Sequence, residues 1–170
     1  TVHATVVPGG STQSNASATS IPFSADNLET ALVAQKQQQT DDGLALSLLG
    51  KPMISVSSSN QKEAERATQS VLDPETALNA INVYRNGMAA DYMTTVFLDT
   101  VNGGSNTAWF LTVPGRHKLN HEVRQAPHLL QSTNPKNFAV TFTVDARWAD
   151  SVTDWRRTWG SKGDNSAFSS

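Results

Sequence analysis

The sequence predicts an α+β fold, with helices in the first half of the chain and mainly antiparallel strands in the second. Apolar residues recur at helical spacing in residues 24–38, alternate along 138–144 and form a continuous run in 108–113. The chain has 170 residues, of which 38% are hydrophobic and 16% charged. This is enough for one domain or two closely joined subdomains, and too apolar for a wholly disordered chain.

Two helices are expected. Ser24 is a favourable N-cap, Asp26 lies in the first turn, and the helix ends before the turn signal Asp41-Asp42-Gly43. A second helix, with a thin apolar stripe, is expected from about Asn60 to Val71, where Asp73-Pro74 ends it. A single further helical turn is expected in residues 74–80.

The strands are expected at several short apolar runs. They are residues 53–56, 81–84, 93–98, 108–113 and 138–144. Asn102-Gly103-Gly104 predicts a hairpin turn between two of them. Pro127 and Pro135 predict irregular structure in 116–135, the strand over 138–144 is expected to be buried, and the small polar residues of 160–170 predict an irregular tail.

Charge and composition exclude several classes of function. The net charge is −2 and no run of Lys or Arg occurs, so no strong field attracts nucleic acid or an acidic membrane. The absence of Cys excludes disulfides, thiolate metal sites and Cys nucleophiles. No apolar run reaches the roughly 18–20 residues that span a bilayer.

The histidines raise the possibility of a zinc-dependent hydrolase. His117 and His121 are four residues apart and His128 follows, but Glu122 comes after the second His rather than between the two. Pro114-Gly115 and Pro127 also disfavour a helix here. We favour surface or interface histidines on a strand. No nucleophile elbow or phosphate-binding loop occurs, so no cofactor is expected.

Tryptophan and arginine gather near the end of the chain. Trp148, Trp155 and Trp159 lie within twelve residues of one another, together with Arg147, Arg156 and Arg157. One interpretation is base stacking with phosphate contacts in a nucleic-acid-binding module. The negative net charge and the neighbouring, supposedly buried strand favour the other interpretation, which is a core and subunit-interface anchor.

The order of these motifs resembles the major capsid proteins of tailed phages with the Hong Kong 97 fold, especially the Mu-like head subunits. The similar segments are the helix Ser24–Leu32 with the Gln-rich stretch and Asp41-Asp42-Gly43, Leu49–Val56, Gln61–Ser70, Ala80–Tyr84, Thr107–Leu111, and Ala146–Ser161. Together they span about residues 20–165.

The resemblance implies a Hong Kong 97-like capsid fold. Residues 1–50 would form part of the peripheral subdomain, 51–135 the axial subdomain at the capsomer centre, and 136–170 the return strand and tail. It implies a structural, non-enzymatic subunit of an icosahedral bacteriophage shell, located in the virion and assembled in the bacterial host cytoplasm. The expected subunit-interface residues are Trp109, Trp155, Arg156, Arg157 and Trp159.

The resemblance also implies partners. They are the protein itself, in pentamers and hexamers, other virion proteins such as portal or decoration proteins, and packaged DNA bound non-specifically, with no membrane. An encapsulin-like nanocompartment shell is the alternative with the same fold. Because the chain opens at Thr1 in a β-like run, we expect upstream residues that hold a long helix and an extended arm.

Overall fold

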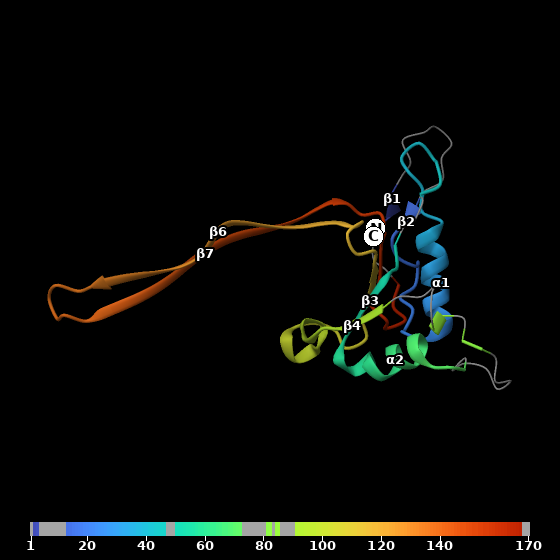
Figure 1. The fold of residues 1–170 in the computed structure, drawn as a ribbon, viewed down its shortest axis with the longest axis horizontal. Coiled ribbons are helices and arrows are strands. Elements are labelled where there is room, and N and C mark those ends of the chain that lie inside the picture. The colour runs from blue at the N-terminus through green and yellow to red at the C-terminus, as the bar shows by residue number, and fades with distance from the viewer. Residues whose placement is uncertain are drawn as a thin grey trace. The chain divides into compact units, whose positions relative to one another are not determined.

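The computed structural model describes residues 2–3, 13–46, 50–72, 81–82, 84–85 and 91–167. The chain divides into two compact units: residues 1–117 with 155–170, and residues 118–154 (Figure 1). The α+β prediction is confirmed, because two helices and mostly antiparallel strands are present. The predicted three-part division is finer than these units. Its boundaries, at residues 50 and 135, both fall inside a unit and stay predictions.

A four-stranded mixed sheet forms the centre of the first unit. Its order is β4 (Asp91–Thr94), β3 (Met53–Val56), β5 (Trp109–Thr112) and β8 (Thr158–Ser161). β3 pairs in parallel with β4, whereas β3 with β5 and β5 with β8 are antiparallel. The two-stranded pair β1 (Val2–His3) and β2 (Gln13–Ser14) belongs to the same unit.

Both predicted helices are present and contribute to the core on one side of this sheet. α1 (Ala25–Lys36) begins where expected, because the Ser24 hydroxyl accepts a hydrogen bond from the N–H of Asn27 at 3.2 Å. α2 (Gln61–Gln69) follows a short 3-10 turn, η1 (Ser58–Asn60), and is shorter than predicted. The buried residues of the two helices form one cluster with those of the sheet, namely Leu28, Ala31, Leu32, Ala64, Ala67, Ile54, Val56, Trp109, Leu111 and Trp159.

Trp109 is the largest fully buried side chain of the described core. Its ring makes an edge-to-face contact with Phe23 at a centroid distance of 5.2 Å, and a tilted contact with Trp159 at 4.8 Å. Its indole N–H donates to the carbonyl of Ile21 at 3.0 Å, so the polar atom of the ring is satisfied inside the core. Trp109 therefore joins the segment before α1 to the middle of the sheet.

The loop between β4 and β5 differs from the prediction. The expected strand over 93–98 ends as β4 at Thr94, and two 3-10 turns follow, η3 (Val96–Leu98) and η4 (Thr100–Asn102). Asn102-Gly103-Gly104 does not form a hairpin, because β4 and β5 both pair with β3 and not with each other. The Asp99 carboxylate directs this path by accepting from the N–H of Ser58 at 2.8 Å and its hydroxyl at 2.6 Å.

The second unit is a ribbon of two long antiparallel strands, β6 (Lys118–Thr133) and β7 (Val140–Asp154). The expectation of irregular structure over 116–135 was wrong. Register shifts between Val123 and Gln125, and between Gln125 and His128, absorb extra residues of β6 around Pro127. Proline is tolerated at such bulges and on free strand edges, and a two-stranded ribbon has a free edge along each strand.

The remaining predictions are partly confirmed. Strands over 53–56 and 108–113 are present as β3 and β5. Ile81 makes a single bridge with Leu72 rather than a strand, and Val83 lies outside the described residues, as does the helical turn expected in 74–80. Gly160 and Ser161, predicted to begin an irregular tail, belong to β8. Phe138 lies in the ribbon's turn, with a positive φ of 58°.

Replacement of Trp109 by Ala is expected to lower the free energy of unfolding by about 3–5 kcal/mol, because it removes both ring contacts and leaves a cavity. Val101, which is 92% exposed, provides the control. Val101→Ala is expected to change stability by less than about 0.5 kcal/mol. Urea unfolding followed by circular dichroism measures both. Similar losses for the two variants would contradict the assignment of Trp109 as the centre of the core.

Candidate interaction surface

The pairing of β6 with β7 sorts the ribbon's side chains into two faces. Directly paired residues point to the same face, and Leu119 pairs with Val152, Val123 with Trp148, and Leu129 with Val144. The extra residues near Pro127 are in β6, so alternation along β7 is unbroken from 140 to 152. One face, here called the apolar face, therefore carries eight apolar residues, namely Leu119, Val123, Leu129, Val140, Phe142, Val144, Trp148 and Val152. The polar residues Gln131, opposite Phe142, and Thr133, opposite Val140, lie on the same face near the ribbon's turn.

The apolar face is open to solvent. Its eight apolar side chains are between 43% and 67% exposed, and none of residues 118–154 is buried. Because fully exposed side chains of this kind have areas of roughly 150–250 Å², the face exposes on the order of 900 Å². The largest apolar patch on a typical monomer is about 300–600 Å². The expectation of a buried strand over 138–144 was therefore wrong, although the shared face of Val140, Phe142 and Val144 was correctly predicted.

The opposite face of the ribbon is polar. Its paired positions include Asn120 with Ser151, Ser132 with Thr141, and His128 with Asp145. The Gln125 amide lies 2.8 Å from the imidazole of His128 and 3.3 Å from the Asp145 carboxylate. Leu130 is the exposed large apolar side chain on this side. The difference between the two faces is that of a sheet with one solvated side and one side to be covered.

One charged pair interrupts the apolar face. His121 pairs directly with Asp150, between the apolar pairs Leu119–Val152 and Val123–Trp148. The His121 Nδ1 atom lies 2.6 Å from a carboxylate oxygen of Asp150. The two side chains are 59% and 74% exposed, so water screens their attraction in a single chain.

The five predicted interface residues lie in the first unit and have different surroundings. Trp109 is fully buried and Trp159 is 3% exposed, so both indoles pack within the chain's own core. Trp155, Arg156 and Arg157 form the segment that leads from the end of β7 to β8. Contact of these residues with a neighbouring copy stays a prediction, but the two buried indoles cannot present an exposed anchor.

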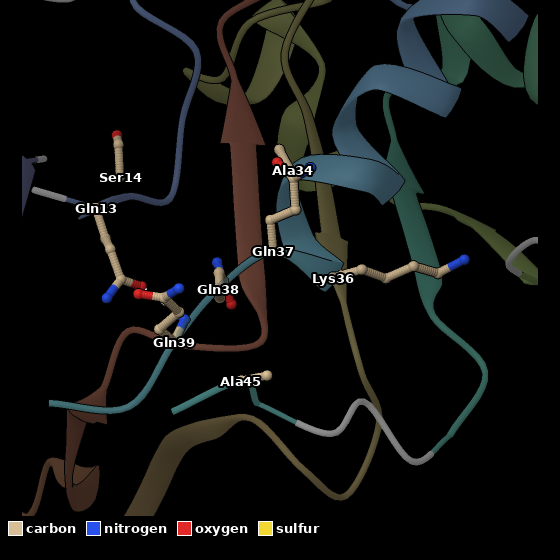
Figure 2. A pocket seen from close by; sticks show the side chains of 8 residues that line it. All are labelled: Gln13, Ser14, Ala34, Lys36, Gln37, Gln38, Gln39 and Ala45. Atoms are coloured by element: carbon tan, nitrogen blue, oxygen red, sulfur yellow. Dashed lines mark hydrogen bonds between the residues drawn. The ribbon is translucent and has the colours of Figure 1, made fainter. Parts of the chain in front are cut away.

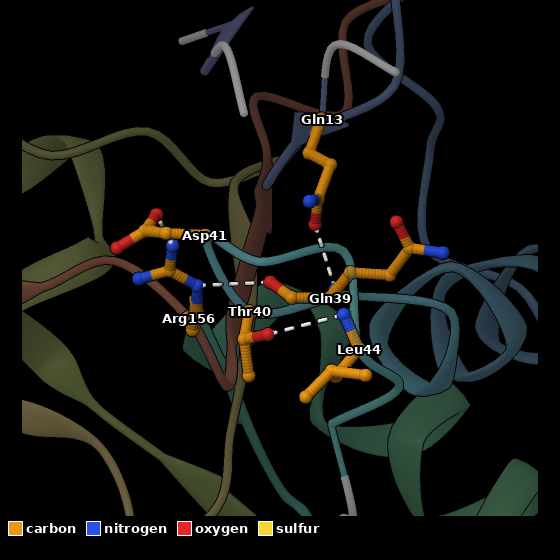
Figure 3. Close-up of polar contacts among 6 residues, drawn as sticks. All are labelled: Gln13, Gln39, Thr40, Asp41, Leu44 and Arg156. Atoms are coloured by element: carbon orange, nitrogen blue, oxygen red, sulfur yellow. Dashed lines mark hydrogen bonds and ion pairs between the residues drawn. The ribbon is translucent and has the colours of Figure 1, made fainter. Parts of the chain in front are cut away.

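Arg156 fixes this segment to the end of α1. Its Nε donates to the carbonyl of Gln39 at 3.0 Å, and its terminal nitrogen pairs with the Asp41 carboxylate (Figure 3). The guanidinium also lies 5.1 Å from the centre of the Trp155 ring. The Gln13 side chain accepts from the N–H of Gln39 at 2.7 Å, so β2 joins the same contact network. The aspartate that pairs with Arg156 thus comes from the turn after α1.

Arg157 is held in a left-handed backbone conformation, with φ of 64°. Residues other than glycine adopt this conformation only at a cost in free energy. Two glutamines of the α1 region hold it there. Gln38 accepts from the N–H of Arg157 at 2.7 Å and donates to the carbonyl of Thr158 at 3.1 Å. Gln35 donates to the carbonyl of Arg157 at 2.9 Å. The Gln-rich stretch is therefore a structural clamp on the backbone that enters β8.

A hollow of about 650 Å³ lies beside this clamp (Figure 2). It is lined by Gln13, Ser14, Ala34, Lys36, Gln37, Gln38, Gln39 and Ala45. The Lys36 side chain extends away from the Gln13, Gln38 and Gln39 amides. Amides and a hydroxyl donate and accept hydrogen bonds, but none of the lining residues is a carboxylate or an imidazole. The described lining of the hollow thus offers amides, a hydroxyl and the Lys36 side chain to a ligand.

The histidines do not gather around an ion. His121 and His128 lie in β6, on opposite faces of the ribbon by their register, and His117 lies just before that strand. Among the described residues, no group of three His, Asp or Glu side chains could hold a metal ion. Within the same part of the chain, none of the helices has the length and apolar character that crossing a bilayer requires.

No family model, curated protein or solved structure matches this chain. Its function is therefore inferred from its own residues, and the exposed apolar face of the ribbon is the most informative surface that they form.

Most residues of this surface were not predicted from the sequence. Val140, Phe142 and Val144 were placed on one face, but Leu119, Val123, Trp148 and Val152 were not joined to them. The available signal was the spacing of Leu119, His121 and Val123 at every second residue, facing Trp148, Asp150 and Val152 at the same spacing. The prolines between the two runs concealed their pairing.

Replacement of Gln38 by Ala is expected to lower the free energy of unfolding by about 1–3 kcal/mol, because it leaves the Arg157 N–H and the Thr158 carbonyl without their partner. Gln37→Ala, at an exposed neighbouring glutamine, is the matched control and is expected to change stability by less than about 0.5 kcal/mol. Urea unfolding measures both values, and hydrogen exchange at Arg157 reports the local effect. Unchanged exchange at Arg157 in Gln38→Ala would contradict the clamp.

Proposed function

We propose that this chain is a structural subunit of an icosahedral bacteriophage capsid, which self-assembles with copies of itself into a shell around DNA. The observation that carries the proposal is the exposed apolar face of the ribbon, on the order of 900 Å². A surface of this size and composition is typical of a permanent contact between proteins. The resemblance of the motif order to Hong Kong 97-type capsid proteins gives the contact its proposed context.

The architecture of the ribbon supports an assembly role. An isolated two-stranded hairpin is marginally stable in water, and stability requires a further strand or a packing partner. Here the strands are 16 and 15 residues long. A shell subunit gains its stability from neighbours, so a long element whose apolar side chains are exposed in one copy suits that role.

The proposal includes the Hong Kong 97-like fold, a virion location and contacts with portal or decoration proteins and with packaged DNA. The net charge of −2 gives the chain little overall attraction to DNA, so packaged DNA would be only a weak, sequence-independent partner. An encapsulin-like compartment would use the same kind of contact. The two kinds of shell differ in what they enclose, because a capsid protects DNA from nuclease whereas a compartment encloses protein cargo.

The full-length protein is expected to assemble into closed particles, measured by sedimentation velocity and negative-stain electron microscopy. Phe142→Lys is expected to reduce the assembled fraction at least about tenfold, because it places a charge in the contact. Thr141→Lys is the matched control, since it adds the same charge to the opposite face of the same strand, beside Ser132. It is expected to assemble like the original protein.

Circular dichroism and near-ultraviolet signals should be the same for both variants, which confirms that the first unit is folded. Nuclease-protected DNA in the particles supports the capsid, and enclosed protein without DNA supports the compartment. A full-length protein that stays monomeric in every condition would contradict self-assembly, as would equal loss of assembly in the two lysine variants.

A further inference from the structure

The size of the apolar face and the position of its charged pair indicate what kind of surface covers it. We propose that this face docks on the same face of a second copy of the chain, with the two copies related by a two-fold axis that runs along the ribbon. The inference rests on the proposed self-assembly and specifies one of its contacts. Three properties of the face carry it: its area, the position of its one charged pair and the direction of that pair across the ribbon.

The area matches one side of a protein–protein contact. An interface of ordinary size buries about 800 Å² on each partner, close to the value on the order of 900 Å² that the apolar face exposes. Trp148 and Phe142, each 61% exposed, supply the aromatic side chains that dominate the energy of such contacts. A contact between two identical faces uses the same residues twice and closes with two copies.

The charged pair restricts the partner. His121 and Asp150 face each other at 2.6 Å, and the pairs on either side of them are apolar. A partner that is wholly apolar would remove water from both groups and leave only their contact with each other in compensation, which is costly. A partner with one sign of charge would be attracted to one group and repelled by the other. The covering surface must therefore bring an acid and a base at the same level of the ribbon.

A second copy brings that pair, and the charges select its orientation. If the two-fold axis runs along the ribbon, β6 of one copy lies over β7 of the other. His121 then lies over Asp150 of the second copy, and Asp150 over its His121. If the axis runs across the ribbon at this pair, His121 lies over His121 and Asp150 over Asp150. The first arrangement is favoured because it brings each carboxylate to an imidazole, which can donate a hydrogen bond to it, whereas the second brings two carboxylates together.

The same arrangement pairs apolar residues at three further levels of the face, whereas Phe142 and Val140 lie over Gln131 and Thr133 of the second copy. Leu119 lies over Val152 of the second copy and Val123 over Trp148, because the two-fold axis places each cross-strand pair over the same pair of the second copy with its two residues exchanged. Leu129 similarly lies over Val144. The arrangement thus keeps the charged pair at one level and leaves the neighbouring levels free of charge. Nucleic acid is a poorer occupant, since the Asp150 carboxylate on this face repels phosphate.

The test uses two full-length variants with opposite charge at this pair. His121→Asp gives two carboxylates, and Asp150→Lys gives an ammonium beside the imidazole. Each variant alone is expected to self-associate at least tenfold more weakly than the original protein at neutral pH, because like charges meet across the contact. An equimolar mixture of the two is expected to recover association to within about threefold. Sedimentation equilibrium measures all of these.

The control pair repeats the charge changes on the adjacent position of the opposite face, where Asn120 pairs with Ser151. Asn120→Asp and Ser151→Lys are expected to associate like the original protein, alone and mixed. Circular dichroism on each variant shows whether the fold is intact. A variant that does not fold is replaced by His121→Glu or Asp150→Arg, which introduce the same charges.

The outcomes separate this inference from the proposed function. If the original protein associates and the two variants recover one another when mixed, the homotypic contact is supported. If the original protein associates but the variants behave like it, or do not recover on mixing, this contact is wrong and self-assembly stands. If the original protein is monomeric at every concentration, the proposed function fails, and this inference fails with it.

Discussion

A two-stranded ribbon has no second layer of its own, so apolar side chains along one of its faces must be covered by something outside the ribbon. This constraint governs residues 118–154. Side chains alternate between the two faces without interruption along β7, so Phe142, Val144, Trp148 and Val152 all lie on one side. Exposing these apolar side chains to water is unfavourable because of the hydrophobic effect, which also drives a domain to fold.

The first unit, unlike the ribbon, buries a cluster of apolar side chains within itself. Its sheet has one side covered by α1 and α2, and Trp109 sits where the buried side chains of these elements converge. Two polar side chains there are matched as well, since those of Trp109 and Ser161 both donate to the carbonyl of Ile21. The chain therefore combines one unit that closes its own core with one that presents an apolar face. This division suits a subunit that folds first and associates afterwards.

The sequence was most informative where the signals are local. The Ser24 cap and the helical spacing behind it predicted α1, and the apolar run around Trp109 predicted the central strand, because capping and periodicity act within a few residues. Long-range pairing was harder. Asn102-Gly103-Gly104 resembled a hairpin turn, but β4 pairs in parallel with β3 and the loop instead follows the Asp99 contacts with Ser58. Pro127 suggested irregular structure, and a bulge accommodates it. Neither the parallel pairing nor the bulge can be predicted from the neighbouring residues alone.

The candidate site illustrates the same limit. Trp148, Trp155 and Trp159 lie within twelve residues and suggested a single cluster, but they occupy three surroundings: the ribbon's apolar face, the Arg156 turn and the core. What joins Trp148 to a surface is Val123, twenty-five positions earlier, through the β6–β7 register. Because the glutamine clamp on Arg157 and the charged pair on the ribbon share no residue, substitutions at one should leave the other intact. Folding of the first unit and the proposed association through the ribbon are therefore expected to be separable properties.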